Sequence, residues 1–127
     1  MLNNAVGWFE IYVEDISRAK AFYERVFEVK LQKLEAVDLD MWAFPMHAGA
    51  SGASGALVKM PDFPRGGQVG ANGTLVYFSS QDCALEAQRA REQGKEIIRD
   101  KFSIGPYGFV ALLKDTEGNI IGIHSQQ

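Results

Sequence analysis

The sequence predicts an α+β fold made of two modules, each with the order strand–helix–three strands. Strand-like stretches rich in aromatic and β-branched residues far outnumber the amphipathic helical stretches, of which there are two. A glycine- and proline-rich stretch at residues 61–73 divides the chain near its midpoint, and the same order of elements then begins again. One helix covers one face of each sheet, so we expect two curved mixed sheets that face each other around a cleft.

The first module is expected at about residues 6–60. Its opening strand is Trp8–Val13, which is rich in aromatic and β-branched residues. Asp15 can cap the following helix, whose apolar residues recur at steps of three and four and predict a stripe that packs on a sheet. The stripe consists of Ile16, Ala19, Phe22, Tyr23 and Val26. Three strand-like stretches complete the module, at about 30–37, 41–46 and 56–60.

The second module is expected at about residues 74–126 and repeats this order. A strand at 74–79 leads to Asp82, a candidate helix cap, and the helix should end just before Gly94. Cys83, Ala87 and Ala90 share one face of the helix. We read Cys83 as a small core residue. Further strands are expected at 96–102, 108–114 and 119–125. The residues between the last two predict a hairpin turn in which Gly118 and Asn119 can take positive φ.

Composition fits one domain spanning residues 1–127 and excludes several classes of protein. Apolar residues make up 46% and charged residues 23% of the chain, and the net charge is −3 without any basic stripe. We therefore expect no nucleic-acid partner. No apolar run approaches the roughly 20 residues that span a bilayer, so no membrane partner is expected. A single cysteine forms no internal disulfide, and a cytoplasmic protein is the resulting expectation.

Two segments resemble a known superfamily. The run WFEIYVEDISRAKAFYERVF at 8–27 is similar to the opening of vicinal-oxygen-chelate proteins, the glyoxalase/bleomycin-resistance/dioxygenase family. The run IGPYGFVALLKDTEGNIIGIHS at 104–125 resembles the last hairpin of the same superfamily. Its members include metal-dependent lyases, epimerases and dioxygenases as well as metal-free binding proteins, so the resemblance implies the fold without fixing the function.

The resemblance also implies where metal ligands would stand. In the metal-dependent members, one ligand lies seven residues before the Asp at the strand end of each half, and a Glu lies four residues after the last turn glycine. These positions are Trp8, Leu75 and Gly122 in this sequence. A divalent ion needs several converging oxygen or nitrogen donors. We therefore expect no standard metal site and no cofactor.

Two other residues are the candidate catalytic pair. If Trp8 and Gly122 point into the cleft, strand alternation directs Glu10 and His124 there as well. Such a pair can act as acid and base or anchor a polar ligand group. The alternatives are a structural Glu–His hydrogen bond and a shifted metal site completed by His47.

Aromatic residues are candidates for the walls of a ligand site, with core packing as the alternative for each. The predicted ligand-binding set is Trp8, Tyr12, Trp42, Tyr77 and Gly122.

The preferred hypothesis is a metal-free protein of this family that binds a small organic molecule in the cleft. The alternative is an enzyme of lyase, isomerase or dioxygenase type that uses a non-standard metal site, or acid–base catalysis by Glu10 and His124. A third hypothesis is a structural domain whose cleft is filled by its own side chains. Because sheet edges must be covered, we also expect a homodimer.

Overall fold

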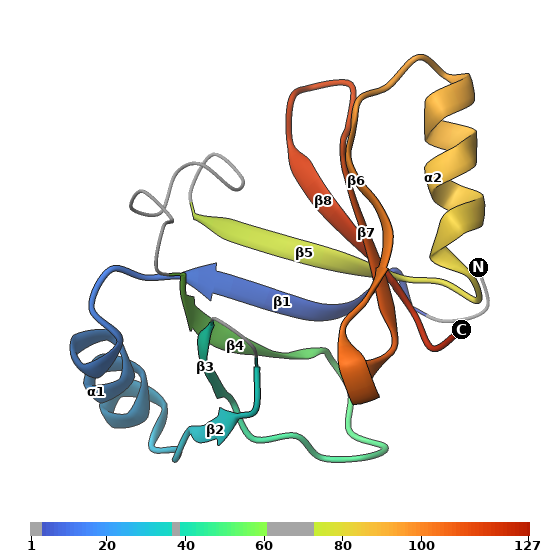
Figure 1. The fold of residues 1–127 in the computed structure, drawn as a ribbon. Helices are drawn as coiled ribbons and strands as arrows, with labels where there is room; N and C mark the ends of the chain where they lie inside the picture. The colour runs from blue at the N-terminus through green and yellow to red at the C-terminus, as the bar shows by residue number, and fades with distance from the viewer. Residues whose placement is uncertain (1–3, 37–38, 61–72) are drawn as a thin grey trace. The chain divides into compact units, whose positions relative to one another are not determined.

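The computed structural model describes residues 4–36, 39–60 and 73–127. The predicted linker at 61–73 lies outside these residues except for Gly73. The chain divides into two compact units: Trp8–Thr74, called here the N-terminal unit, and Leu75–Gln127 together with Met1–Gly7, called the C-terminal unit. The strand–helix–three-strand order occurs twice, so the α+β class and the paired βαβββ modules are confirmed (Figure 1).

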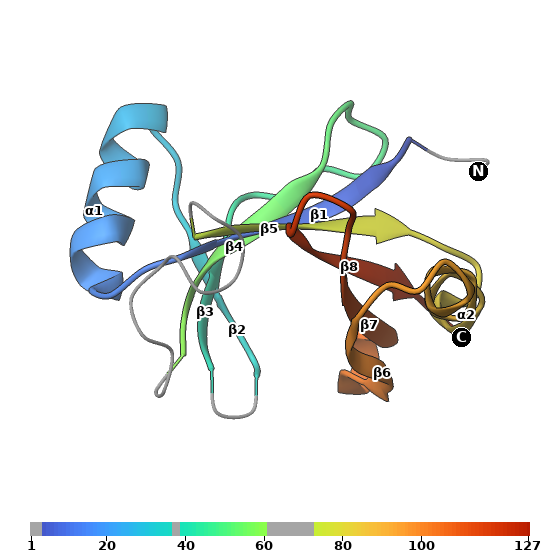
Figure 2. The same cartoon turned by 90° about the horizontal axis from the view of Figure 1, so that it is seen from above.

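The N-terminal unit contains one helix beside a mixed sheet (Figure 2). Its elements are β1 (Val6–Tyr12, whose first two residues belong to the C-terminal unit), α1 (Ile16–Phe27), β2 (Gln32–Leu34), β3 (Asp40–Ala43) and β4 (Ser54–Lys59). The strand order is β2-β3-β4-β1, with β1 parallel to β4 and the other pairs antiparallel. The stretch predicted at 41–46 ends early because Pro45 has no N–H for the ladder; Phe44 N makes the last bond, to Gly55 O at 2.9 Å.

Helix α1 begins where the sequence predicts. The carboxylate of Asp15 accepts a 3.0 Å hydrogen bond from Arg18 N, and the helix ends at Glu28 in the left-handed conformation (φ 53°). The predicted apolar stripe is partly wrong, because Phe22 and Val26 are 59% and 53% exposed. Both side chains therefore lie outside the part of α1 that the sheet covers.

The two faces of β1 have different surroundings. Phe9 points to the face covered by α1, since its ring lies 5.7 Å from that of Phe44, which in turn contacts Tyr23 of the helix at 5.6 Å. Side chains alternate along a strand, so Trp8, Glu10 and Tyr12 all point to the opposite face. This is the alternation that the sequence predicts for β1.

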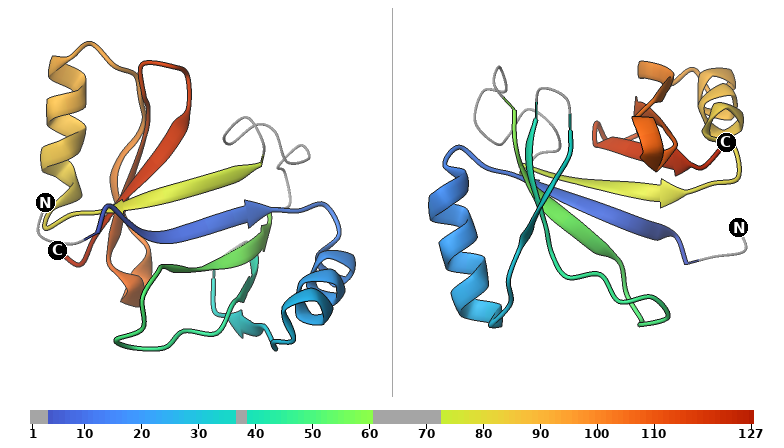
Figure 3. Two further views of the ribbon diagram at one scale, coloured as in Figure 1. Left: turned by 180° about the vertical axis from the view of Figure 1, so that it is seen from behind. Right: turned by 60° about the horizontal axis from the view of Figure 1, so that its bottom comes forward.

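The C-terminal unit has the same order with one addition (Figure 3). Its elements are β5 (Thr74–Ser79, whose first residue belongs to the N-terminal unit), α2 (Cys83–Glu92), β6 (Ile97–Ser103), the 3₁₀ turn η1 (Gly105–Tyr107), β7 (Phe109–Lys114) and β8 (Ile120–Ser125). The strand order is β5-β8-β7-β6, with β5 parallel to β8. Residues 105–107 form a 3₁₀ turn with Pro106 in its first positions.

The core of the C-terminal unit lies between α2 and its sheet. Cys83 is fully buried there, as predicted, and packs with Ala87, Ala111 and Ile123. Full burial of a side chain such as Ile123 stabilises the fold by about 1.5–3 kcal/mol. The residues of β8 that face the helix are Ile121 and Ile123, so Gly122 and His124 point to the other face, as the alternation predicts.

Polar contacts fix the start of α2 and the last hairpin. The carboxylate of Asp82 accepts from Ala84 N (3.0 Å) and from Lys101 Nζ (2.9 Å), and the Lys101 bond is the main reason why the pKa of Asp82 is lowered. Gly94 follows the helix with φ 75°. In the hairpin Gly118 has φ 85°, as predicted, but Asn119 does not take positive φ; its side chain and N–H are bound by Asp115 instead.

Candidate functional site

A buried carboxylate lies on the helix-free face of the N-terminal unit. Glu10 is 8% exposed, and both of its oxygens accept hydrogen bonds from neighbours on the same strand. Trp8 Nε1 donates to Oε2 at 3.2 Å, and Tyr12 Oη donates to Oε1 at 2.5 Å. These donors partly replace the water that burial removes from the charged group. The structure thus brings together three of the predicted site residues.

Small side chains lie beside this carboxylate on β4 and β3. Glu10 is in register with Ala56 on β4, which pairs with Ala43 on β3. Both alanines are buried, with 0% and 2% exposure. Because paired residues project to the same face, the β4 side of Glu10 is apolar, and Trp8 and Tyr12 flank it along β1.

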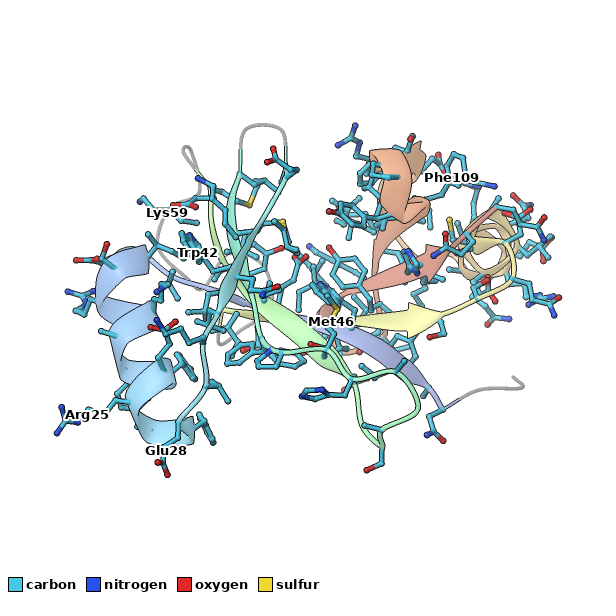
Figure 4. All side chains as sticks on the ribbon, turned by 90° about the horizontal axis from the view of Figure 1, so that it is seen from below. Arg25, Glu28, Trp42, Met46, Lys59 and Phe109 are labelled. Atoms are coloured by element: carbon cyan, nitrogen blue, oxygen red, sulfur yellow. The ribbon has the colours of Figure 1, made fainter. Side chains whose placement is uncertain are left out.

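Trp42 lies on the other face of the same sheet. It is in register with Leu57, whereas Glu10 is in register with Ala56, so the two side chains project to opposite sides. Lys20 of α1 places its Nζ 5.0 Å from the centre of the Trp42 ring, and Asp40 accepts a 2.9 Å bond from the indole N–H. Figure 4 shows Trp42 on the α1 side of β3. The structure therefore separates Trp42 from Trp8, Glu10 and Tyr12.

In the C-terminal unit, the ring of Tyr77 lies over Gly122. The two residues are in register across β5 and β8, and a Cβ atom at position 122 would overlap Cδ1 and Cε1 of the Tyr77 ring. Position 122 therefore has no room for a side chain while this ring stays in place. Leu75, on the same face of β5 as Tyr77, is almost completely buried.

His124 lies one step further along β8 on the Gly122 face. It is half-buried, and its Nε2 lies 2.6 Å from the carbonyl oxygen of Tyr107 in the 3₁₀ turn. Sequence reasoning did not reveal this contact, because every residue has a main-chain carbonyl and residue types carry no signal for it. His124 and Glu10 belong to different units, and their action as a pair stays a prediction.

The residues at the standard metal positions do not fit a divalent ion. The indole of Trp8 has only an N–H donor, Leu75 has no donor atom, and Gly122 has no side chain. The ring of Tyr77 also takes the space that a ligand at position 122 would need. Across the described parts of the chain, no three His, Cys, Asp or Glu side chains come together as a metal site would require. His47 is exposed in the connection between β3 and β4.

Comparison with known proteins gives the class. The model of the Glyoxalase/Bleomycin resistance protein/Dioxygenase superfamily matches residues 5–123, and the chain belongs to this superfamily. No curated protein matches the chain. Neither helix of the described residues is long and apolar enough to cross a membrane.

Solved structures with the same fold share little sequence with the chain. Methylmalonyl-CoA epimerase of Streptomyces coelicolor, in complex with 2-nitronate-propionyl-CoA, is 16% identical, with a TM-score of 0.71 over 96% of this chain and 94% of that one. The Mycobacterium tuberculosis methylmalonyl-CoA epimerase is 15% identical, with a TM-score of 0.69 over 100% and 93%. A hypothetical protein of Bacillus halodurans is 15% identical, with a TM-score of 0.74 over 96% and 94%.

Proposed function

We propose that this protein binds a small organic molecule on the β1 face that carries Trp8, Glu10 and Tyr12, without the divalent metal of its metal-dependent relatives. The observation that carries the proposal is the buried Glu10 carboxylate between two aromatic side chains. Ligand sites are typically apolar with a few placed polar groups, and this face has that composition.

The chemistry of Glu10 favours ligands with a hydrogen-bond donor. An ionised carboxylate only accepts hydrogen bonds. A ligand amine or hydroxyl would join the Trp8 and Tyr12 donors or replace one of them, while the rings contact its apolar part. A cationic amine gains most, because charge-assisted hydrogen bonds are about twice as strong as neutral ones.

A matched pair of ligands tests the proposal. 2-Phenylethylamine should raise the Tm, whereas 3-phenylpropionate, which has the opposite charge, should not. A ligand at 100 times its Kd stabilises the fold by about 2.7 kcal/mol. Glu10→Gln should abolish the amine effect, and the exposed Glu35→Gln serves as the control. Equal responses of Glu10→Gln and the parent protein would contradict the assignment.

Metal content tests the second half of the proposal. Protein purified without chelators or an affinity tag should hold less than about a tenth of an equivalent of Zn, Ni, Mn or Fe by elemental analysis, before and after incubation with each ion. Near-stoichiometric metal would refute a metal-free site, and Glu10, His47 and His124 would then be the residues to substitute.

The second candidate function is acid–base catalysis by Glu10 and His124. A carboxylate enclosed by a protein can remove a proton from carbon next to a carbonyl, the chemistry of an epimerase. The buried position of Glu10 favours this candidate. The test is incorporation of deuterium from D₂O into methylmalonyl-CoA. Exchange no faster than in buffer, or unchanged in Glu10→Gln, would exclude this activity.

We also infer a cytoplasmic homodimer. The single cysteine is a buried free thiol, which suits a reducing compartment. α1 exposes an apolar patch formed by Phe22, Val26 and Phe27. Apolar side chains gathered on one surface are typical of protein interfaces.

A further inference from the structure

The contact between His124 and the 3₁₀ turn defines the protonation of the imidazole. Nε2 of His124 lies 2.6 Å from the Tyr107 carbonyl oxygen. A carbonyl oxygen only accepts hydrogen bonds, so the ring nitrogen must be the donor. The proton of a neutral His124 is therefore on Nε2, and Nδ1 is left as the acceptor.

The turn that carries this carbonyl is itself held in place. Gly105 N donates to Ser103 Oγ at 3.1 Å, and Ile104 N donates to Gly108 O at 2.9 Å. Gly108 has φ 104°, and a Cβ there would overlap the carbonyl oxygen of Ser125. Glycine at this position lets the turn approach β8 closely enough to contact His124.

Nδ1 is the ring nitrogen of His124 that the contact with the 3₁₀ turn leaves unused. Within residues 4–36, 39–60 and 73–127, no hydrogen bond to Nδ1 is present. In the register of β5 and β8, Ser79 lies beside His124, and Tyr77 lies beside Gly122, two residues earlier on the same face. On this face β7 contributes Val110, Leu112 and the charged Lys114. β6 contributes Phe102 and Arg99, whose guanidinium lies 3.7 Å from the centre of the Phe102 ring.

We propose that the Tyr107 carbonyl holds His124 as the Nε2–H tautomer, so that Nδ1 accepts a hydrogen bond from a ligand hydroxyl or amine lying against the Tyr77 ring. The inference rests on the proposed function and adds a second polar contact for the same class of ligand. Tyr107 is the positioning residue, because it acts on the ligand only through His124.

Nδ1 of His124 keeps its orientation when the ring gains a proton, because Nε2 stays bound to the Tyr107 carbonyl. The imidazolium still donates from Nε2, and the charge strengthens this bond. Only Nδ1 changes from acceptor to donor. A ligand hydroxyl can donate to Nδ1 only when this nitrogen carries no proton.

Nitrogen-15 NMR of the histidine rings tests the tautomer directly. The chain has two histidines, so His124→Gln assigns both signals. At pH 8 we expect His124 to be the Nε2–H tautomer alone, whereas the exposed His47 should show a mixture. Gly108→Ala, which displaces the turn, should convert His124 to a mixture. Gly118→Ala is the control, because it has a similar positive φ (85°) in another turn. An Nδ1–H tautomer or a mixture at His124 in the parent protein would overturn the inference.

Phenol and anisole test the ligand contact. Both offer the same ring to Tyr77, but only phenol has a hydroxyl donor. Phenol should shift the Nδ1 resonance of His124 at pH 8, and anisole should leave it unchanged. No shift with phenol, or equal shifts with both, would overturn the ligand contact. If 2-phenylethylamine still stabilises the protein through Glu10, the proposed function survives that result; if no amine binds, the proposed function fails separately.

Discussion

Substitution of Gly122 by alanine should destabilise the protein through the Tyr77 ring. Gly122 is not among the positive-φ glycines, so the backbone itself accepts alanine. The added methyl would overlap two ring carbons of Tyr77, and such overpacking costs about 1–3 kcal/mol. Replacing glycine by alanine in an unstrained backbone returns about 0.4–1 kcal/mol. We expect a net loss of about 1–2 kcal/mol in the free energy of unfolding.

Urea unfolding followed by circular dichroism measures the cost of Gly122→Ala in three proteins: the parent protein, Tyr77→Phe and Tyr77→Ala. In the parent protein and in Tyr77→Phe, where the ring remains, Gly122→Ala should have the same cost. In Tyr77→Ala the ring is absent, and the cost should disappear. This is a double-mutant cycle with a coupling of about 1–3 kcal/mol.

A neutral or stabilising Gly122→Ala would refute the reasoning. So would a cost that persists in Tyr77→Ala, because the ring would then not be its cause. Either result would also weaken the conclusion that Tyr77 excludes a metal-ligand side chain from position 122.

Three further predictions concern pH, assembly and the start of α2. The pKa of Asp82 is lowered in the folded protein from its ordinary 3.8, mainly by Lys101, so the ionised carboxylate stabilises the fold above about pH 3.8 and this stabilisation is lost as the pH falls further. In Lys101→Met, the free energy of unfolding should therefore fall less steeply as the pH is lowered below about 3.8. The same pH dependence in the variant and the parent protein would contradict this. Phe22→Glu should convert the dimer into a monomer in sedimentation experiments, while the free energy of unfolding of the monomer changes by less than about 0.5 kcal/mol. A monomeric parent protein would exclude the dimer. The hydroxyl of Ser125, 1% exposed, accepts from Cys83 N at 3.0 Å, so Ser125→Ala should cost about 1–3 kcal/mol in urea unfolding, and a neutral result would show that this N–H finds another acceptor.

The repeated modules follow from the sequence because local signals agree with the fold. The caps Asp15 and Asp82 lie where the helices begin, and Gly94 takes the positive φ that its type predicts. Alternation along β1 and β8 also separates helix-facing residues from the others, since the period of two holds along both strands.

Predictions that depend on contacts between residues far apart in the sequence were less accurate. Trp42 carries the same aromatic signal as Trp8, yet the register of β3 turns it toward α1. Phe22 belongs to a regular apolar stripe, but the area that a sheet covers depends on strand lengths that residue types do not determine. The acceptor for His124 is a main-chain carbonyl, and only the folded turn brings it there.

The hydrogen bond from Ser79 N to Ala5 O, 3.0 Å long, joins parts of the C-terminal unit that are far apart in sequence. During synthesis at about 5–20 residues per second, Ala5 leaves the ribosome roughly 4–15 s before its partner is made. The main chain at Ala5 thus lacks this partner for seconds, and unpaired main-chain groups of a strand are open to pairing with other chains.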